Sequence, residues 1–238
     1  LITTILPRYA LTDTVHMLLL DSRTHSEKDA LILESMLNSL AIDYVVRQKV
    51  GTSINFYSMN QFPVIDLMEI LPWYQFIVFR ALELNYTSHS LQPFAQYCGY
   101  DGPPFIWDDE RRFEIRCELD ALYFHLYLGT LSDWQNQGTP ELLSYLSTPR
   151  HAVEYIMETF PIVKRKDDKE YGEYRTKLRI LEIYDQMTNC LATNTEYRST
   201  LNPPPGPPCD EEGKFIPVEQ WDKNNWPKHI HKCERSAE

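Results

Sequence analysis

One long segment, residues 108–129 (DDERRFEIRCELDALYFHLYLG), limits the possible folds more than any other part of the chain. Asp108 suits the N-cap position. Apolar residues then recur every three or four positions, which places them on one face of an α-helix. They are Phe113, Cys117, Ala121, Phe124 and Leu128. A second segment, 170–192, has the same spacing, so the sequence predicts a mainly helical protein.

Further helices are predicted at 26–51, 75–85, 89–98 and 148–160. In the first of these, Ser26 and Asp29 suit the two ends of a capping pair. In the last, Thr148 and Pro149 suit the N-cap and first helical positions. The stretch 132–140 (SDWQNQGTP) is expected to be a loop.

A small β element is expected at the N-terminal end. Residues 1–20 are rich in Thr, Ile, Val and Leu, with Pro7 and Asp13 as interruptions, and predict two short strands. Residues 52–65 are expected to return as an extended segment that ends near Pro63. The predicted fold class is therefore mostly α with a small N-terminal β element (α+β) and a helical C-terminal module.

Composition narrows the class of protein. The chain has 238 residues, 43% hydrophobic and 13% aromatic, which is typical of a globular protein whose rings pack in the core. No apolar run approaches the roughly 20 residues that span a bilayer, and MLLLD (17–21) is far too short. The five scattered cysteines do not form a disulfide framework, so we expect a cytoplasmic protein. The strand-like start at Leu1 predicts a piece of a longer protein.

Positive charge is concentrated in one place in an acidic chain. The net charge is -11, yet residues 162–179 carry seven Lys or Arg and four Asp or Glu, a local surplus of three. We expect a turn here that runs into a helix N-terminus, a combination that favours phosphate. The candidate DNA-binding residues are Lys164, Arg165, Lys166, Arg175, Lys177 and Arg179. In the alternative interpretation the acids of the same segment neutralise them on an ordinary solvated surface.

A second candidate group follows the first predicted helix and mixes cations with small polar side chains. Its members are Arg47, Lys49, Thr52, Ser53 and Asn55. They suit contacts with a nucleic-acid backbone, and Asn55 suits a base edge. Alternatively, Arg47 and Lys49 only answer the dipole at a helix C-terminus.

No complete catalytic site is present in the sequence. Asn202-Pro203-Pro204 resembles the Asn-Pro-Pro-aromatic motif of amino-group methyltransferases, but Pro205 replaces the ring and no GxGxxG loop precedes it. Glu212-Gly213-Lys214 matches only half of a nuclease site. His229, His231, Cys233 and Cys209 lack the spacing of a structural zinc site. We therefore assign no catalytic and no metal-binding residue.

Two blocks resemble one family. Residues 37–65 (LNSLAIDYVVRQKVGTSINFYSMNQFPVI) are similar to the target-recognition region of bacterial adenine-specific DNA methyltransferases, including type IIG and type ISP-like restriction–modification enzymes. Residues 79–127 and 155–187, with YIMETFPIVKRKDDKEYGEYRTKLRILEIYDQM in the last, resemble the region that follows it. Together the blocks cover most of 26–190.

The resemblance implies a division of the chain and a function. Residues 1–68 would end the target-recognition domain, 69–200 would form a helical C-terminal domain, and 201–238 would be a Pro-rich linker and flexible tail. The chain would be a non-catalytic part that positions double-stranded DNA for a methyltransferase domain, in cis or in trans. It would hold no cofactor itself, whereas the parent would use S-adenosylmethionine. The alternative is a helical docking module of a phage-defence complex that does not contact DNA.

Overall fold

Helices make up most of the chain in this computed structural model, which describes residues 1–7, 16–49 and 54–232. The α-helices are α1 (Glu27–Leu37), α2 (Leu40–Lys49), α3 (Phe56–Met59), α4 (Leu67–Ile70), α5 (Tyr74–Asn85), α6 (Gln92–Tyr97), α7 (Asp109–Leu128), α8 (Leu131–Gln137), α9 (Pro140–Tyr145), α10 (Pro149–Glu158), α11 (Pro161–Tyr171) and α12 (Arg175–Thr193). Short 3-10 turns lie at Leu71–Trp73, His89–Leu91 and Val218–Gln220. The described part of the chain contains no helix long and apolar enough to cross a membrane.

The chain divides into two compact units, and the division falls within α7. Unit 1 contains Leu1, Asn38–Ile70 and Arg116–Arg198. Unit 2 contains Ile2–Leu37, Leu71–Ile115 and Ser199–Glu238.

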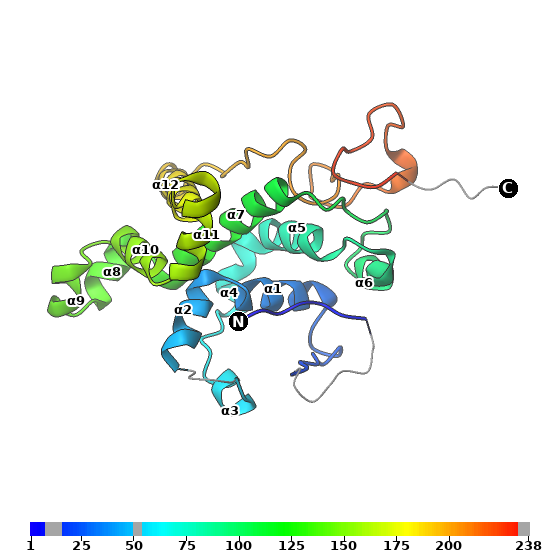
Figure 1. Ribbon diagram of the computed structural model, residues 1–238. Coiled ribbons are helices and arrows are strands. Elements are labelled where there is room, and N and C mark those ends of the chain that lie inside the picture. Colours follow the sequence, from blue (N-terminus) through cyan, green and yellow to red (C-terminus); the bar gives the residue numbers. More distant parts are fainter. Residues whose placement is uncertain (8–15, 50–53, 233–238) are drawn as a thin grey trace. The chain divides into compact units, whose positions relative to one another are not determined.

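The core of unit 1 forms around α12. Its apolar stripe buries Ile180, Ile183, Tyr184 and Met187, whereas Leu191 is exposed. Both α10 and α11 pack against α12 (Figure 1). From α7, the His125 ring stacks on Tyr184 with centroids 3.8 Å apart. The buried apolar face of α12 therefore fixes the helices that carry the charged segment.

In unit 2, α1 packs against α5, and residues after 199 complete the core. The rings of Tyr100 and Trp221 are stacked, with centroids 6.3 Å apart. Isolated antiparallel bridges join Phe105 to Ile230 and Cys209 to Phe215. The segment expected to be a linker and flexible tail thus contributes buried residues to unit 2, among them Trp221, His229 and Ile230.

The predicted N-terminal β element is not seen. Residues 1–7 and 16–20 contain no strand, and residues 8–15 lie outside the described chain. Strand-forming composition alone is insufficient, because isolated two-stranded hairpins are marginal without further strands or a packed face. The expected extended return at 52–65 is also wrong in part, because Phe56–Met59 is helical and Asn55 caps it by accepting the Ser58 N–H at 2.8 Å.

The helix predicted at 26–51 is two helices. Ser26 and Asp29 form the expected reciprocal cap. The break at Asn38-Ser39 is stabilised because Ser39 accepts the Ile42 N–H and Asp120 accepts the Leu40 N–H at 2.7 Å. Residues 50 and 51, the predicted end of this helix, lie outside the described residues.

Two further predictions in unit 1 are corrected. The expected loop at 132–140 lies largely in α8 and α9, because Thr130 forms a capping box with Asp133 and Thr139 caps the helix that starts at Pro140. The expected turn at the start of 162–179 is the helix α11. Pro161 occupies its first position, and Gly172 ends it with a left-handed φ of 76°.

The helices predicted at 75–85, 108–129 and 148–160 are confirmed as α5, α7 and α10 within two residues.

Asp120 gives unit 1 a pH-dependent contribution to stability. Burial, with a smaller effect of the nearby Asp43 carboxylate, raises the pKa of Asp120 from 3.8 to about 7, although the Leu40 N–H and Arg116 oppose the rise. The folded state therefore holds this proton more tightly than the unfolded chain. Between about pH 4 and 7 the contribution of Asp120 to stability falls as pH rises.

Asp120→Asn is expected to remove this dependence while its side-chain oxygen still accepts the Leu40 N–H. The free energy of unfolding of the variant minus that of the wild type should increase from pH 5 to pH 8. Urea denaturation followed by circular dichroism at each pH measures it. A difference that stays constant over this range would show that Asp120 does not titrate there.

Candidate functional site

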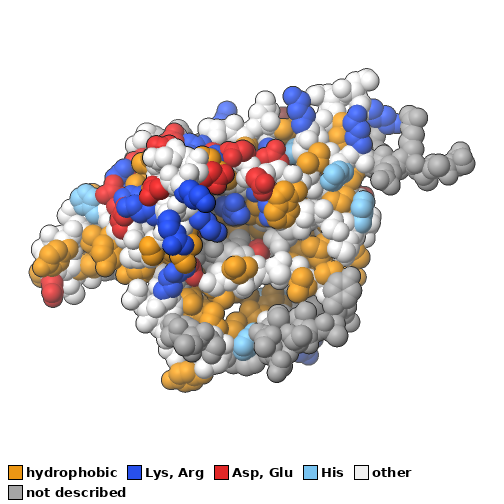
Figure 2. Space-filling model, viewed as in Figure 1, with side chains coloured by type: hydrophobic (Ala, Val, Ile, Leu, Met, Phe, Trp, Pro, Cys, Tyr) orange, Lys and Arg blue, Asp and Glu red, His pale blue; other side chains and the backbone are white. Residues whose placement is uncertain are grey.

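Exposed cations gather on α11. Arg165, Lys166 and Lys169 are exposed and form no ion pair with any of residues 1–7, 16–49 and 54–232. We call these three residues the α11 cation face. Figure 2 shows Lys and Arg side chains grouped over α11, with Asp and Glu side chains along the border. Lys169 was not among the residues selected from the sequence.

The local fold explains why cations dominate this face although acids are interspersed with them. Asp167 is buried and accepts the Thr176 N–H at 2.7 Å, which satisfies a free donor in the first turn of α12. One carboxylate of α11 is thereby turned inward. The exposed cations next to it remain in solvent.

The other cations of 162–179 have partners. Lys164 and Lys177 both donate to Glu158, at 2.9 and 2.7 Å. Arg179 pairs with Glu182 at 2.6 Å. The Arg175 guanidinium lies 4.6 Å from the centre of the Tyr171 ring. The alternative interpretation, in which acids neutralise these cations, therefore holds for part of the segment. The acid that pairs with two of its lysines is Glu158, which lies outside residues 162–179.

The second predicted group is only partly brought to α11. The Arg47 guanidinium lies 4.8 Å from the ring centre of Phe160, the residue before α11, and Arg47 also pairs with Asp43 at 2.9 Å. Lys49 donates to the Gln61 carbonyl at 3.2 Å. The side-chain oxygen of Asn55 is engaged in capping α3. Thr52 and Ser53 lie outside the described residues.

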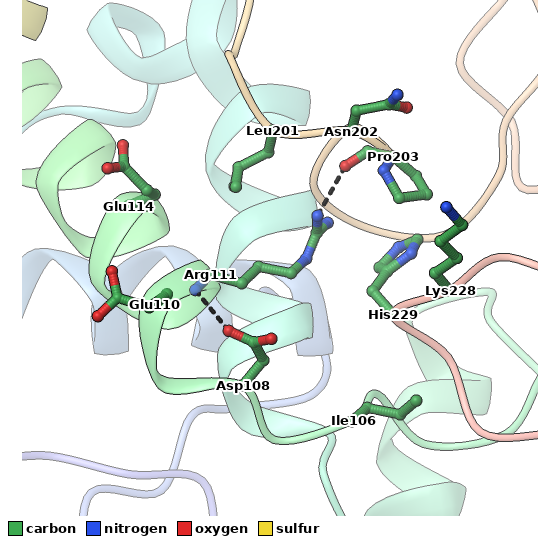
Figure 3. Close-up of a pocket in the computed structure, with 10 residues that line it drawn as sticks. All are labelled: Ile106, Asp108, Glu110, Arg111, Glu114, Leu201, Asn202, Pro203, Lys228 and His229. Carbon is green, nitrogen blue, oxygen red and sulfur yellow. Dashed lines mark hydrogen bonds between the residues drawn. The ribbon is translucent and has the colours of Figure 1, made fainter.

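Unit 2 contains a separate pocket of about 330 Å³. Figure 3 shows it between the first turns of α7 and the segments near Asn202 and His229. Acidic and basic groups both line it. The lining residues are Ile106, Asp108, Glu110, Arg111, Glu114, Leu201, Asn202, Pro203, Lys228 and His229.

Arg111, one of the residues that line this pocket, makes several contacts there. It forms a buried two-pronged ion pair with Glu83 and donates to the carbonyls of Pro203 and Pro204 at 2.7 and 3.1 Å. Glu83 also accepts the Gly206 N–H at 2.7 Å. Gly206 has a φ of 88° and a Cβ there would lie 2.6 Å from Phe79, so this close docking requires glycine. Arg111 is thus committed to holding the chain near 203–206.

His229 adds one unused acceptor to the pocket. Its Nε2 lies 2.8 Å from the Gly206 carbonyl, which only accepts, so Nε2 carries the proton. Burial lowers the pKa of His229, which keeps the ring neutral and leaves Nδ1 as a bare acceptor with no partner among the described residues. The acidic, basic and neutral side chains that line the pocket do not together favour one class of ligand. No cluster of three or more His, Cys, Asp or Glu in the described chain is placed to hold a metal.

Comparisons of the chain with protein-family models, with curated proteins and with solved structures returned no match. The resemblance of residues 26–190 to DNA methyltransferases therefore stays a prediction. The pairing of Glu158 and the buried Glu83–Arg111 pair were not expected from the sequence, since each joins residues from different helices.

Glu83→Ala is expected to lower the free energy of unfolding by about 3 kcal/mol, because it leaves the buried Arg111 guanidinium without its carboxylate. It should also expose the 199–232 segment to limited proteolysis. Glu83→Gln is the matched control, because it keeps one acceptor and should lose less stability. Equal cleavage of the wild type and Glu83→Ala within 199–232 would argue against this anchoring role.

Proposed function

We propose that this chain is the non-catalytic DNA-binding and positioning portion of an adenine-specific DNA methyltransferase or restriction–modification enzyme. Its partners are double-stranded DNA and a methyltransferase domain, in cis or in trans. The parent enzyme would act in the cytoplasm, extrude an adenine and methylate it with S-adenosylmethionine. The family resemblance of residues 37–65, 79–127 and 155–187 supports the identity of the parent.

The observation that carries the DNA-binding proposal is the α11 cation face. Three exposed cations on one short helix suit phosphate contacts, and each such contact releases counterions from DNA. Arg47 adds a cation close to the start of α11. The net charge of -11 opposes DNA elsewhere, so attachment depends on this local surface.

The expected role is positioning without base recognition. Lysine and arginine contacts to phosphate fix the register of a protein on a duplex but carry no sequence information. Asn55, the residue suggested for a base edge, uses its side-chain oxygen in a helix cap. Sequence recognition in the parent would therefore come from other residues.

A docking module is the second candidate, and exposed aromatic and aliphatic residues favour it. Tyr145, Tyr155 and Ile162 are 80%, 53% and 55% exposed. Tyr145 and Tyr155 line an open groove of about 410 Å³ in unit 1. Aromatic residues are enriched in protein interfaces, so this surface suits the methyltransferase domain or another protein of a defence complex.

The triple variant Arg165→Ala, Lys166→Ala, Lys169→Ala tests the DNA-binding proposal. It should weaken binding to a 25-base-pair duplex and reduce the slope of log K against log salt by about 2 to 3, since roughly 0.9 counterion is released per phosphate contact. Fluorescence anisotropy between 25 and 200 mM salt measures both quantities.

The matched control is Lys214→Ala, Lys223→Ala, Lys232→Ala, which removes the same charge from exposed positions in unit 2. It should leave the salt slope unchanged. If both triple variants weaken binding equally, only the net charge matters and the α11 cation face is not the site. If the wild-type chain shows no salt-dependent binding, the docking module becomes the preferred function.

A further inference from the structure

The Glu158 carboxylate accepts hydrogen bonds from two different helices. Its Oε2 accepts from Lys164 of α11 at 2.9 Å, and its Oε1 accepts from Lys177 of α12 at 2.7 Å. Each oxygen thus contacts a separate ammonium group. Two oxygens of a phosphodiester would meet the same pair of donors in the same way.

A carboxylate at the position of Glu158 does not stabilise α10. It is the last residue of α10, where the helix dipole is negative and cations are preferred. The two lysines compensate: hydrogen bonds from Lys177 and then Lys164 lower the pKa of Glu158. The Glu158 and Lys164 side chains are each 44% exposed and that of Lys177 is 21% exposed, so solvent reaches all three groups.

We infer that Lys164 and Lys177 form a phosphodiester-binding site that the Glu158 carboxylate occupies in the free protein. On this inference, a DNA phosphate displaces Glu158 and takes over both ammonium groups. The inference rests on the proposed function, and it extends the DNA contact from the α11 cation face to α12.

Replacing the Glu158 carboxylate by a DNA phosphate costs the fold little stability. Exposed ion pairs contribute little to stability, because water screens them and ordering long side chains costs entropy. Displacement also leaves the fold intact, because the adjoining Tyr174 hydroxyl still donates to the Met157 carbonyl at 2.8 Å. Glu158 therefore acts as an internal competitor that lowers affinity for DNA without holding the helices together. Asp168, whose charge also acts on Lys164, would remain near the site.

Glu158→Gln tests the inference in the full chain. It should tighten binding to the 25-base-pair duplex about fivefold at 100 mM salt and steepen the salt slope by about 1 to 2, as up to two further phosphate contacts form. Glu158→Ala should do the same and guards against a residual hydrogen bond from the amide. Adding Lys164→Ala and Lys177→Ala to Glu158→Gln should abolish the gain.

The matched control is Glu170→Gln, which removes the same charge from an exposed position on α11 where the carboxylate accepts from the Tyr171 hydroxyl at 3.0 Å. It should change the salt slope little. Equal effects of Glu158→Gln and Glu170→Gln would overturn the inference, because general charge would then explain both.

Inorganic phosphate, titrated at constant ionic strength, separates a phosphodiester site from a free-phosphate site. If Glu158→Gln gains affinity for inorganic phosphate but not for duplex DNA, the assignment to DNA is wrong. The proposed function is judged separately from the wild-type salt slope and the α11 triple variant. Wild-type binding that passes that test, together with an inert Glu158→Gln, rejects this inference alone.

Discussion

Burial of the apolar stripe of α12 is the interaction on which the charged surface of unit 1 depends. Ile180, Ile183 and Met187 are fully or almost fully buried, and both α10 and α11 pack on this helix. The end of α10, the first turns of α11 and the start of α12 are thereby held together. Glu158 and its two lysines come from these three segments, so the charge pattern is a consequence of helix packing.

The positions of the carboxylates on these packed helices decide which cations are left without an ion pair. Asp167 is directed inward to cap α12, and Glu158 engages Lys164 and Lys177. Within residues 162–179, the exposed cations that form no ion pair with any described residue are those of the α11 cation face. An acidic chain can in this way present a local positive surface whose strength is limited by its own acids. On the proposed function, such a surface would give the weak, salt-sensitive attachment to DNA that suits a positioning module.

Local signals predicted much of the fold, whereas contacts distant in sequence were not accessible. Apolar periodicity with the Asp108 cap located α7, and the Thr148-Pro149 cap located α10, because such signals reside in each helix and its first flanking residue. The N-terminal strands were wrong because strand propensity needs a partner that composition does not specify. The packing of residues after 199 depends on Glu83 and Arg111, which lie 123 and 92 residues from their contacts at Gly206 and Pro203. Likewise, the sequence indicated the cations of 162–179, but their pairing with Glu158 follows only from how α10 packs.

Lysine accessibility in the presence and absence of duplex DNA tests the central claim most directly. The chain would be treated briefly with an amine-acetylating reagent, and modification at each lysine would be quantified by mass spectrometry. The account predicts that DNA protects Lys166 and Lys169 and leaves Lys214 and Lys223 as reactive as before. If saturating DNA leaves the modification of each of these four lysines unchanged, the account is contradicted.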